Sequence, residues 1–224
     1  METDQLIQHL ARQARPVQPL PAPRARAMVW LASSFPYVVA IVVGYRLLGY
    51  ETFFALEAPY LFQQLATLAT AATAAVAAFC CAVPGRNARI ALLPLVPLSL
   101  WLASLATEWA GIWLEAGGAG LSLGTGWACL PASILLGLAP GVVMLAMLRK
   151  GASIYPRTTV ALAALASAAL GNLGLRLFNV GDVAVMSLVW HLSAIALLSA
   201  IAWRFGPGIL PWPLVSMQNG GTMK

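Results

Sequence analysis

Nearly everything after Arg26 in this chain reads as a series of apolar segments, each long enough to cross a bilayer. The segment before them, residues 1–26, is polar and cannot cross. The chain has 224 residues, of which 60% are hydrophobic and 9% are charged, whereas soluble domains carry about 25% charged residues. The composition therefore indicates a membrane protein whose sizeable water-facing piece is an N-terminal head.

The apolar segments predict an all-α fold with six transmembrane helices. A helix needs about 20 apolar residues to span the hydrocarbon, so the length leaves no room for a folded soluble domain. The runs are continuous rather than alternating, which favours helices over a barrel. We predict spans at about 28–49, 59–83, 90–114, 127–148, 158–178 and 183–204. The predicted domains are a cytoplasmic head with a Pro-rich linker (1–26), a transmembrane domain (27–206) and a cytoplasmic tail (207–224).

The basic residues predict the orientation. With the N-terminus in the cytoplasm, all but Arg46 and Arg176 of the 13 basic residues fall in cytoplasmic segments, as the positive-inside rule requires. The outer loops carry only acidic charges, at Glu51, Glu57, Glu115 and Asp182. Both termini are therefore expected in the cytoplasm, with no cleavable signal peptide. Because the net charge of +6 is scattered over the loops, it indicates topology rather than nucleic-acid binding.

The head divides into an amphipathic helix and a stiff tether. Asp4 lies in the first predicted turn, where the helix dipole favours an acid. Leu6, Ile7 and Leu10 fall on one face at helical spacing. The following prolines impose an extended linker, at Pro16, Pro19, Pro21 and Pro23. Adsorption to the membrane surface and docking in a groove of a cytoplasmic protein both stay open. Docking is favoured because the face is small, lacks Trp and Phe, and sits beside acids that anionic lipid would repel.

Ionisable groups inside the spans are costly, so each is a candidate functional residue. Glu108 lies in the outer half of the third span, and His191 lies in the middle of the sixth. Candidate partners of Glu108 at similar depth are Arg46 and Arg176. For both residues a structural interpretation is favoured: Glu108 as an interface-facing or paired carboxylate, and His191 as a hydrogen-bonded histidine. Gln63 and Gln64 in the second span more often join helices than bind a solute.

Cysteines and small residues give weaker signals. Cys80 and Cys81 are adjacent on one helix, point apart and are interpreted as packing residues. Cys129 faces an oxidising compartment, where a free thiol can sense oxidants or soft metals or pair with another chain, although packing is favoured. The Gly137-x-x-x-Gly141 motif predicts tight helix contact within or between chains, which leaves self-association open.

The sequence contains no motif of a known enzyme class. It lacks a P-loop, a Gly-x-Ser-x-Gly elbow, a His-Glu-x-x-His motif and a carboxylate pair at catalytic spacing. Its two histidines, His9 and His191, cannot build a histidine metal site. We therefore expect no enzymatic activity, no cofactor and no bound metal.

A series of short motifs runs through the chain in a fixed order and spacing. They are Thr3-Asp4-Gln5-Leu6-Ile7 and Pro16-Val17-Gln18-Pro19-Leu20-Pro21; Ala82-Val83-Pro84-Gly85-Arg86; Trp101-Leu102 with Glu108; Cys129 with Gly137-Leu138-Ala139-Pro140; Arg149-Lys150-Gly151-Ala152; and Ala168-Ala169-Leu170-Gly171-Asn172-Leu173. Each motif is low in complexity, so their order carries the specificity. Together they resemble the NrsF family, bacterial inner-membrane anti-sigma factors with six spans.

The resemblance implies a function, a partner and a location. Such proteins hold an extracytoplasmic-function sigma factor at the bacterial inner membrane through the N-terminal head, and release it when a stress signal arrives. The implied partners are that sigma factor and membrane lipid, with no direct nucleic-acid contact. Carried onto this chain, the sigma-contacting residues are Asp4, Leu6, Ile7, Leu10, Pro19 and Leu20.

The chain departs from the family pattern at one point. Members often carry a second outer cysteine, in a His-Cys pair between the fifth and sixth spans. The matching stretch here reads Phe178-Asn179-Val180-Gly181-Asp182. Cys129 thus has no thiol partner on its side of the membrane within one chain, and a two-cysteine sensor is not carried over. Cys129, Glu108 and His191 are kept as candidate sensing residues.

Two other classes of protein are alternatives. A small transporter or channel would use Glu108, Arg176 and His191 along a pathway, but residues 28–114 and 127–204 show no convincing internal repeat. A structural subunit of a larger membrane complex would make the head dispensable. Mutations distinguish the anti-sigma factor from the transporter. An anti-sigma factor loses function through changes in residues 3–20, and a transporter through changes in the intramembrane polar residues.

Overall fold

The computed structural model describes most of the chain. The described residues are 3–13, 20–49, 57–116, 129–151, 153 and 155–177, together with 200, 201, 204, 205, 208 and 210. The elements in this part are α1 (Thr3–Gln13), α2 (Pro23–Leu47), α3 (Ala58–Cys81), the 3-10 helix η1 (Ala88–Leu92), α4 (Leu95–Ala116), α5 (Cys129–Leu148) and α6 (Pro156–Leu175). No strand occurs among the described residues, which confirms the all-α prediction for them.

Proline determines where several helices begin. Pro23, Pro59 and Pro156 lie in the first two positions of α2, α3 and α6, where a missing N–H loses no hydrogen bond and φ is already suited to a helix. The first apolar run was expected to start near residue 28, but α2 begins at Pro23 because proline supplies an earlier start. A turn at residues 93–94 likewise separates η1 from α4 inside the third predicted span, since Pro94 has no N–H to continue a helix.

Four helical stretches are long and apolar enough to cross a membrane. They are Pro23–Leu47, Ala58–Cys81, Arg89–Glu108 and Pro156–Leu175, which correspond to the first, second, third and fifth predicted spans. The apolar helical stretch Leu135–Leu148, in α5, is shorter. Most of the sixth predicted span, 183–204, lies outside the described residues, so the count of six spans stays a prediction.

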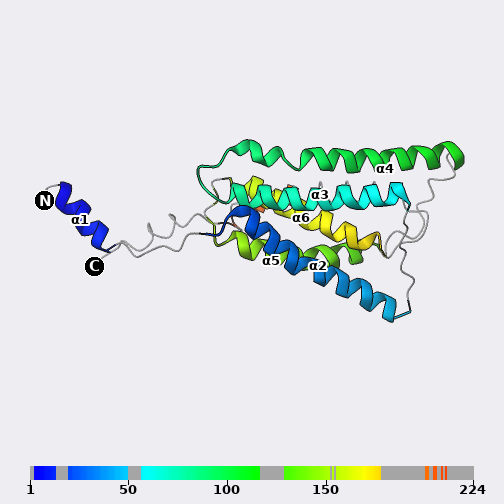
Figure 1. Cartoon of the computed structure of the whole chain (residues 1–224), viewed down its shortest axis with the longest axis horizontal. Helices are drawn as coiled ribbons and strands as arrows, with labels where there is room; N and C mark the ends of the chain where they lie inside the picture. Colours follow the sequence, from blue (N-terminus) through cyan, green and yellow to red (C-terminus); the bar gives the residue numbers. More distant parts are fainter. Residues whose placement is uncertain are drawn as a thin grey trace.

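The long helices form a bundle with α3, α5 and α6 at its centre (Figure 1). α3 and α5 both pack extensively on α6, α2 lies against α3 and α5, and α4 lies on the outside of the bundle against α3. Alanine is the commonest residue of the core, which includes Ala71, Ala74, Ala75 and Ala78 of α3 and Ala163 and Ala166 of α6. Such residues let helix backbones approach closely, and close packing is what holds helices together in lipid.

The backbones of α5 and α6 approach each other closely. A Cβ atom added to Gly171 of α6 would lie 3.0 Å from the backbone nitrogen of Gly137 and 3.1 Å from its Cα. Added to Gly137 or Gly141, it would meet Ser167 at 3.5 or 3.6 Å. The small-residue motif of α5 therefore makes a contact within the chain.

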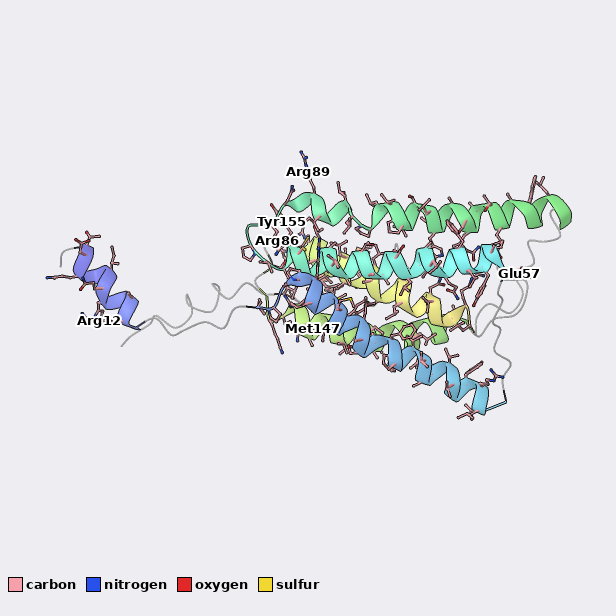
Figure 2. The ribbon with its side chains drawn as sticks, viewed as in Figure 1. Arg12, Glu57, Arg86, Arg89, Met147 and Tyr155 are labelled. Atoms are coloured by element: carbon pink, nitrogen blue, oxygen red, sulfur yellow. The ribbon has the colours of Figure 1, made fainter. Side chains whose placement is uncertain are left out.

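The bundle has two ends, which we call the tether end and the far end. The tether end holds the start of α2, the ends of α3 and α5, η1 and the start of α6. The far end holds the end of α2, the starts of α3 and α5, and the ends of α4 and α6. Figure 2 shows Arg86, Arg89, Met147 and Tyr155 at the tether end and Glu57 at the far end. Figure 1 shows α1 set apart from the bundle, on the side of the tether end.

Candidate functional site: head helix, far-end cluster and tether anchor

α1 is a short helix whose charges suit its dipole. Asp4 lies in the first turn and Arg12 in the last turn, so each charge meets the opposite partial charge of a helix end. Asp4 is exposed, and Ile7 keeps 57% of its surface exposed. Leu6 and Leu10 belong to the same helix, but their side chains lie outside the described part. The side chains of Asp4 and Ile7 are thus accessible to a partner.

Three helices meet at a polar cluster toward the far end. Glu108 of α4 accepts a hydrogen bond of 2.7 Å from Nε2 of Gln63 in α3. Nη2 of Arg176, the C-cap residue of α6, lies 3.3 Å from the same carboxylate oxygen. Arg176 also donates to Oε1 of Gln63. We call these three residues the far-end cluster; each contacts the other two, and together they join α3, α4 and α6.

The far-end cluster is only partly shielded from its surroundings. The side chains of Arg176 and Glu108 keep 19% and 37% of their surface exposed, whereas Gln63 is buried. Removing one partner of an ion pair with this exposure costs less than breaking a fully buried pair, but either charge alone would be costly in hydrocarbon. Arg46, the other expected partner, is exposed on α2. The arrangement compensates charge and links helices, which agrees with the structural interpretation of Glu108 and Gln63.

A buried cation lies at the tether end. Arg26, in the first turn of α2, is 5% exposed. Its Nη2 donates to the backbone oxygen of Met147 near the end of α5, and its guanidinium carbon lies 4.6 Å from the centre of the Phe79 ring in α3. The last carbonyls of a helix lack partners and carry partial negative charge, so a cation there is favourable, and the aromatic face adds a cation–π attraction. We call Arg26, Met147 and Phe79 the tether anchor.

Arg26 is also the first of three α2 side chains that donate to backbone oxygens of α5. Nε1 of Trp30 donates to the oxygen of Pro140 at 2.9 Å, and the hydroxyl of Tyr37 donates to the oxygen of Leu135 at 2.9 Å. Residue numbers rise along α2 as they fall along α5, so the two helices are antiparallel. We call this series the α2–α5 ladder. It fixes α2 against α5 along much of its length.

The predicted site residues fall at opposite ends of the molecule. Asp4, Ile7 and Leu20 are exposed residues of the head and tether, whereas Glu108 belongs to the far-end cluster, so the structure does not bring these groups together. Cys129 is the first residue of α5, but its side chain, like Pro19 and His191, lies outside the described part. Among the described residues, no group of three or more His, Cys, Asp or Glu can hold a metal ion.

Sequence reasoning missed the tether anchor. It placed Arg26 with Arg24 among the charges that set topology, but the structure buries Arg26 and leaves Arg24 exposed. The available signal was spacing, since Arg26, Trp30 and Tyr37 recur at intervals that share one helical face. That pattern crosses the expected start of the span near residue 28, so its two halves were assigned to different domains.

These features define a class of protein, and comparison of the sequence places it in a family. Several helices long and apolar enough to cross a membrane, joined to a short exposed polar helix, make a helical protein of the membrane type. The family described as NrsF, negative regulator of sigma F, matches residues 10–212. This match covers most of the chain, so the chain belongs to the NrsF family. Neither a curated protein nor a solved structure matches it.

The family description gives the broad function. It implies negative regulation of a sigma factor, so the implied partner is a sigma factor and the family is regulatory rather than a class of enzymes. The match begins at residue 10, within α1. It includes the tether, the anchor and the far-end cluster, but it leaves Asp4, Leu6 and Ile7 outside.

Proposed function

We propose that this chain is a membrane anti-sigma factor that holds an extracytoplasmic-function sigma factor through residues 1–26 and releases it on a stress signal. The observation that carries the proposal is an exposed helix, α1, set apart from the bundle in a member of this family. A negative regulator has to keep the sigma factor from RNA polymerase. An exposed helix on a tether suits this task, because a helix laid in a groove is a recurring mode of peptide recognition.

The proposed contact uses one face of α1 and the start of the tether. Leu6, Ile7 and Leu10 fill an apolar groove of the sigma factor, and Asp4 meets its basic surface. Pro19 and Leu20 extend the contact. The exposure of Ile7 and Leu20, at 57% and 41%, supports this assignment.

We place the tether end in the cytoplasm and the bundle in the bacterial inner membrane. Exposed basic residues gather at the tether end, at Arg24, Arg86, Arg89, Arg149, Lys150 and Arg157. Glu57 lies at the far end, and Glu108 lies toward it, beside Arg176 at the end of α6. The positive-inside rule then puts the N-terminus inside, and a sixth span would return the C-terminus to the same side.

A stress signal from outside the cytoplasm would meet the far end first. Glu108 lies there and keeps part of its carboxylate side chain exposed, and Cys129 begins α5 at the same end. We keep both, with His191, as proposed sensing residues. A Cys129→Ser variant that still releases the sigma factor under oxidants would remove the cysteine from this role.

Co-purification tests the sequestration. The full chain, a variant lacking residues 2–19 and the double variant Leu6→Glu/Leu10→Glu are expressed in membranes with each sigma factor encoded nearby. The deletion stops at residue 19 because Arg26 belongs to the tether anchor and its removal would disturb α2. We expect the full chain to retain a sigma factor, and both variants to retain at least about tenfold less, since each buried leucine contributes roughly 1.5–3 kcal/mol.

The matched control is Gln5→Glu/Gln8→Glu, which adds the same two charges to the opposite face of α1. It should retain the sigma factor like the full chain. Equal retention by the leucine variant and the control would exclude the apolar face as the contact. Equal retention by the deletion variant would exclude residues 2–19 as the contact.

A further inference from the structure

The first turn of α2 has little local support. Its N-cap residue, Ala22, makes no side-chain cap hydrogen bond, and the turn contains no acidic residue. Arg24 and Arg26 instead place two positive charges at the positive end of the helix dipole, which is unfavourable. Pro23 is the favourable local feature, because its φ suits the first helical position. The turn therefore depends on contacts from other helices.

The tether anchor supplies those contacts. The guanidinium of Arg26 holds the backbone oxygen of Met147 in α5 and lies on the ring of Phe79 in α3. The backbone N–H of Arg26 donates to the oxygen of Ala22 at 3.0 Å and so closes the first turn. The residue that the bundle holds is thus also the residue that closes the turn, and residues 20–22 leave the bundle directly from it.

The anchor is also incompletely satisfied. Nη1 of Arg26 is buried and has no hydrogen-bond partner among the described residues. A buried donor without a partner costs free energy, which offsets part of what the other contacts contribute. The anchor can therefore open at a lower cost than a fully paired arginine.

We propose that Arg26 is the positioning residue of the sigma-binding head, because it fixes the point from which the tether leaves the bundle. This inference rests on the proposed function of the head. When the anchor opens, residues 23–26 change from helix, at 1.5 Å per residue, to extended chain, at about 3.1 Å per residue, so the tether lengthens by roughly 6 Å. The direction of the tether is then no longer fixed, and the held sigma factor changes its distance from the membrane.

Three variants of the full chain in lipid nanodiscs test the inference. Arg26→Met removes the charge at similar length, Arg26→Lys keeps it, and Arg24→Met is the matched control at an exposed arginine in the same turn. Spin-labelled amino acids replacing Leu20 and Arg86 report the distance from tether to bundle and leave the native cysteines in place. Hydrogen exchange reports the backbone amides of the first turn and of the α3–α6 core.

We expect a narrow distance distribution in the parent chain and in Arg24→Met. In Arg26→Met the distribution should broaden and its mean shift outward by up to roughly 6 Å, with exchange of the Arg26-position amide faster by about tenfold or more. Arg26→Lys should restore most of both values, since an ammonium also donates to the Met147 oxygen. Exchange in the α3–α6 core should stay unchanged in every variant.

Two results overturn the inference. The first is an Arg26→Met variant with unchanged distance and first-turn exchange, and the second is faster exchange throughout the core, which would make Arg26 a general folding residue. Co-purification of the unlabelled chains separates this test from the proposed function. A parent chain that retains no sigma factor refutes sequestration and leaves the distance measurement valid for the tether itself.

Discussion

At the scale of single residues, the far-end cluster balances one charge against another. Replacement of Glu108 by Gln keeps an oxygen that can accept from Gln63 but leaves Arg176 without an anion. We expect Glu108→Gln to destabilise the protein by about 1–2 kcal/mol, below the value for a fully buried pair because both side chains are partly exposed. The thermal melting of the purified protein in detergent micelles measures the effect.

The control for Glu108 is Glu57→Gln, which removes the exposed carboxylate before α3. It should lower the melting temperature less than Glu108→Gln does, because the structure records no ion pair for Glu57 among the described residues. Equal losses for the two variants would mean that the charge matters through the overall field and that the contact with Arg176 contributes little.

At the scale of elements, the α5–α6 contact depends on one missing side chain. A Cβ on Gly171 would lie 3.0 Å from a backbone atom of Gly137, and a backbone cannot rotate away as a side chain can. We expect Gly171→Ala to destabilise the protein by about 1–3 kcal/mol through overpacking. Gly111→Ala in α4 is the control, since no described atom from another helix lies within 4 Å of its added Cβ; it should be neutral or stabilising by up to about 1 kcal/mol. A destabilised Gly111→Ala protein, with Gly171→Ala unaffected, would contradict this packing.

The elements also show what the sequence can predict. Apolar runs located the described long helices to within a few residues, because hydrocarbon thickness sets their length. The start of α2 was misplaced since hydropathy does not register Pro23 as a helix start. The ion-pair partner of Glu108 was harder to predict. Arg46 and Arg176 have similar predicted depths in the membrane, and only the packing of α6 beside α3 selects Arg176. Likewise, no pattern of alanines indicates which helix an Ala-rich face will meet.

At the scale of the whole molecule, the described helices predict how the chain threads the membrane. A phosphatase that requires disulfides is active only outside the cytoplasm. Fused after Arg86 or Gly151, at the tether end, it should be inactive; fused after Gly117, beyond α4, it should be active. A fusion after Lys224 tests the span count, since an inactive enzyme there agrees with six spans and an active one with five. Activity at Arg86 would reverse the proposed orientation.

The α2–α5 ladder has a consequence for how this sequence can diverge. All three acceptors, on Met147, Pro140 and Leu135, are main-chain oxygens, which any residue supplies. These hydrogen bonds therefore do not depend on the α5 side chains at the three positions. Residues there can be substituted without loss of the hydrogen bonds from α2. The donors on α2 have no such freedom, because each contact needs a particular side chain. Across descendants of this chain, substitutions should accumulate at the three acceptor positions sooner than at Arg26, Trp30 and Tyr37.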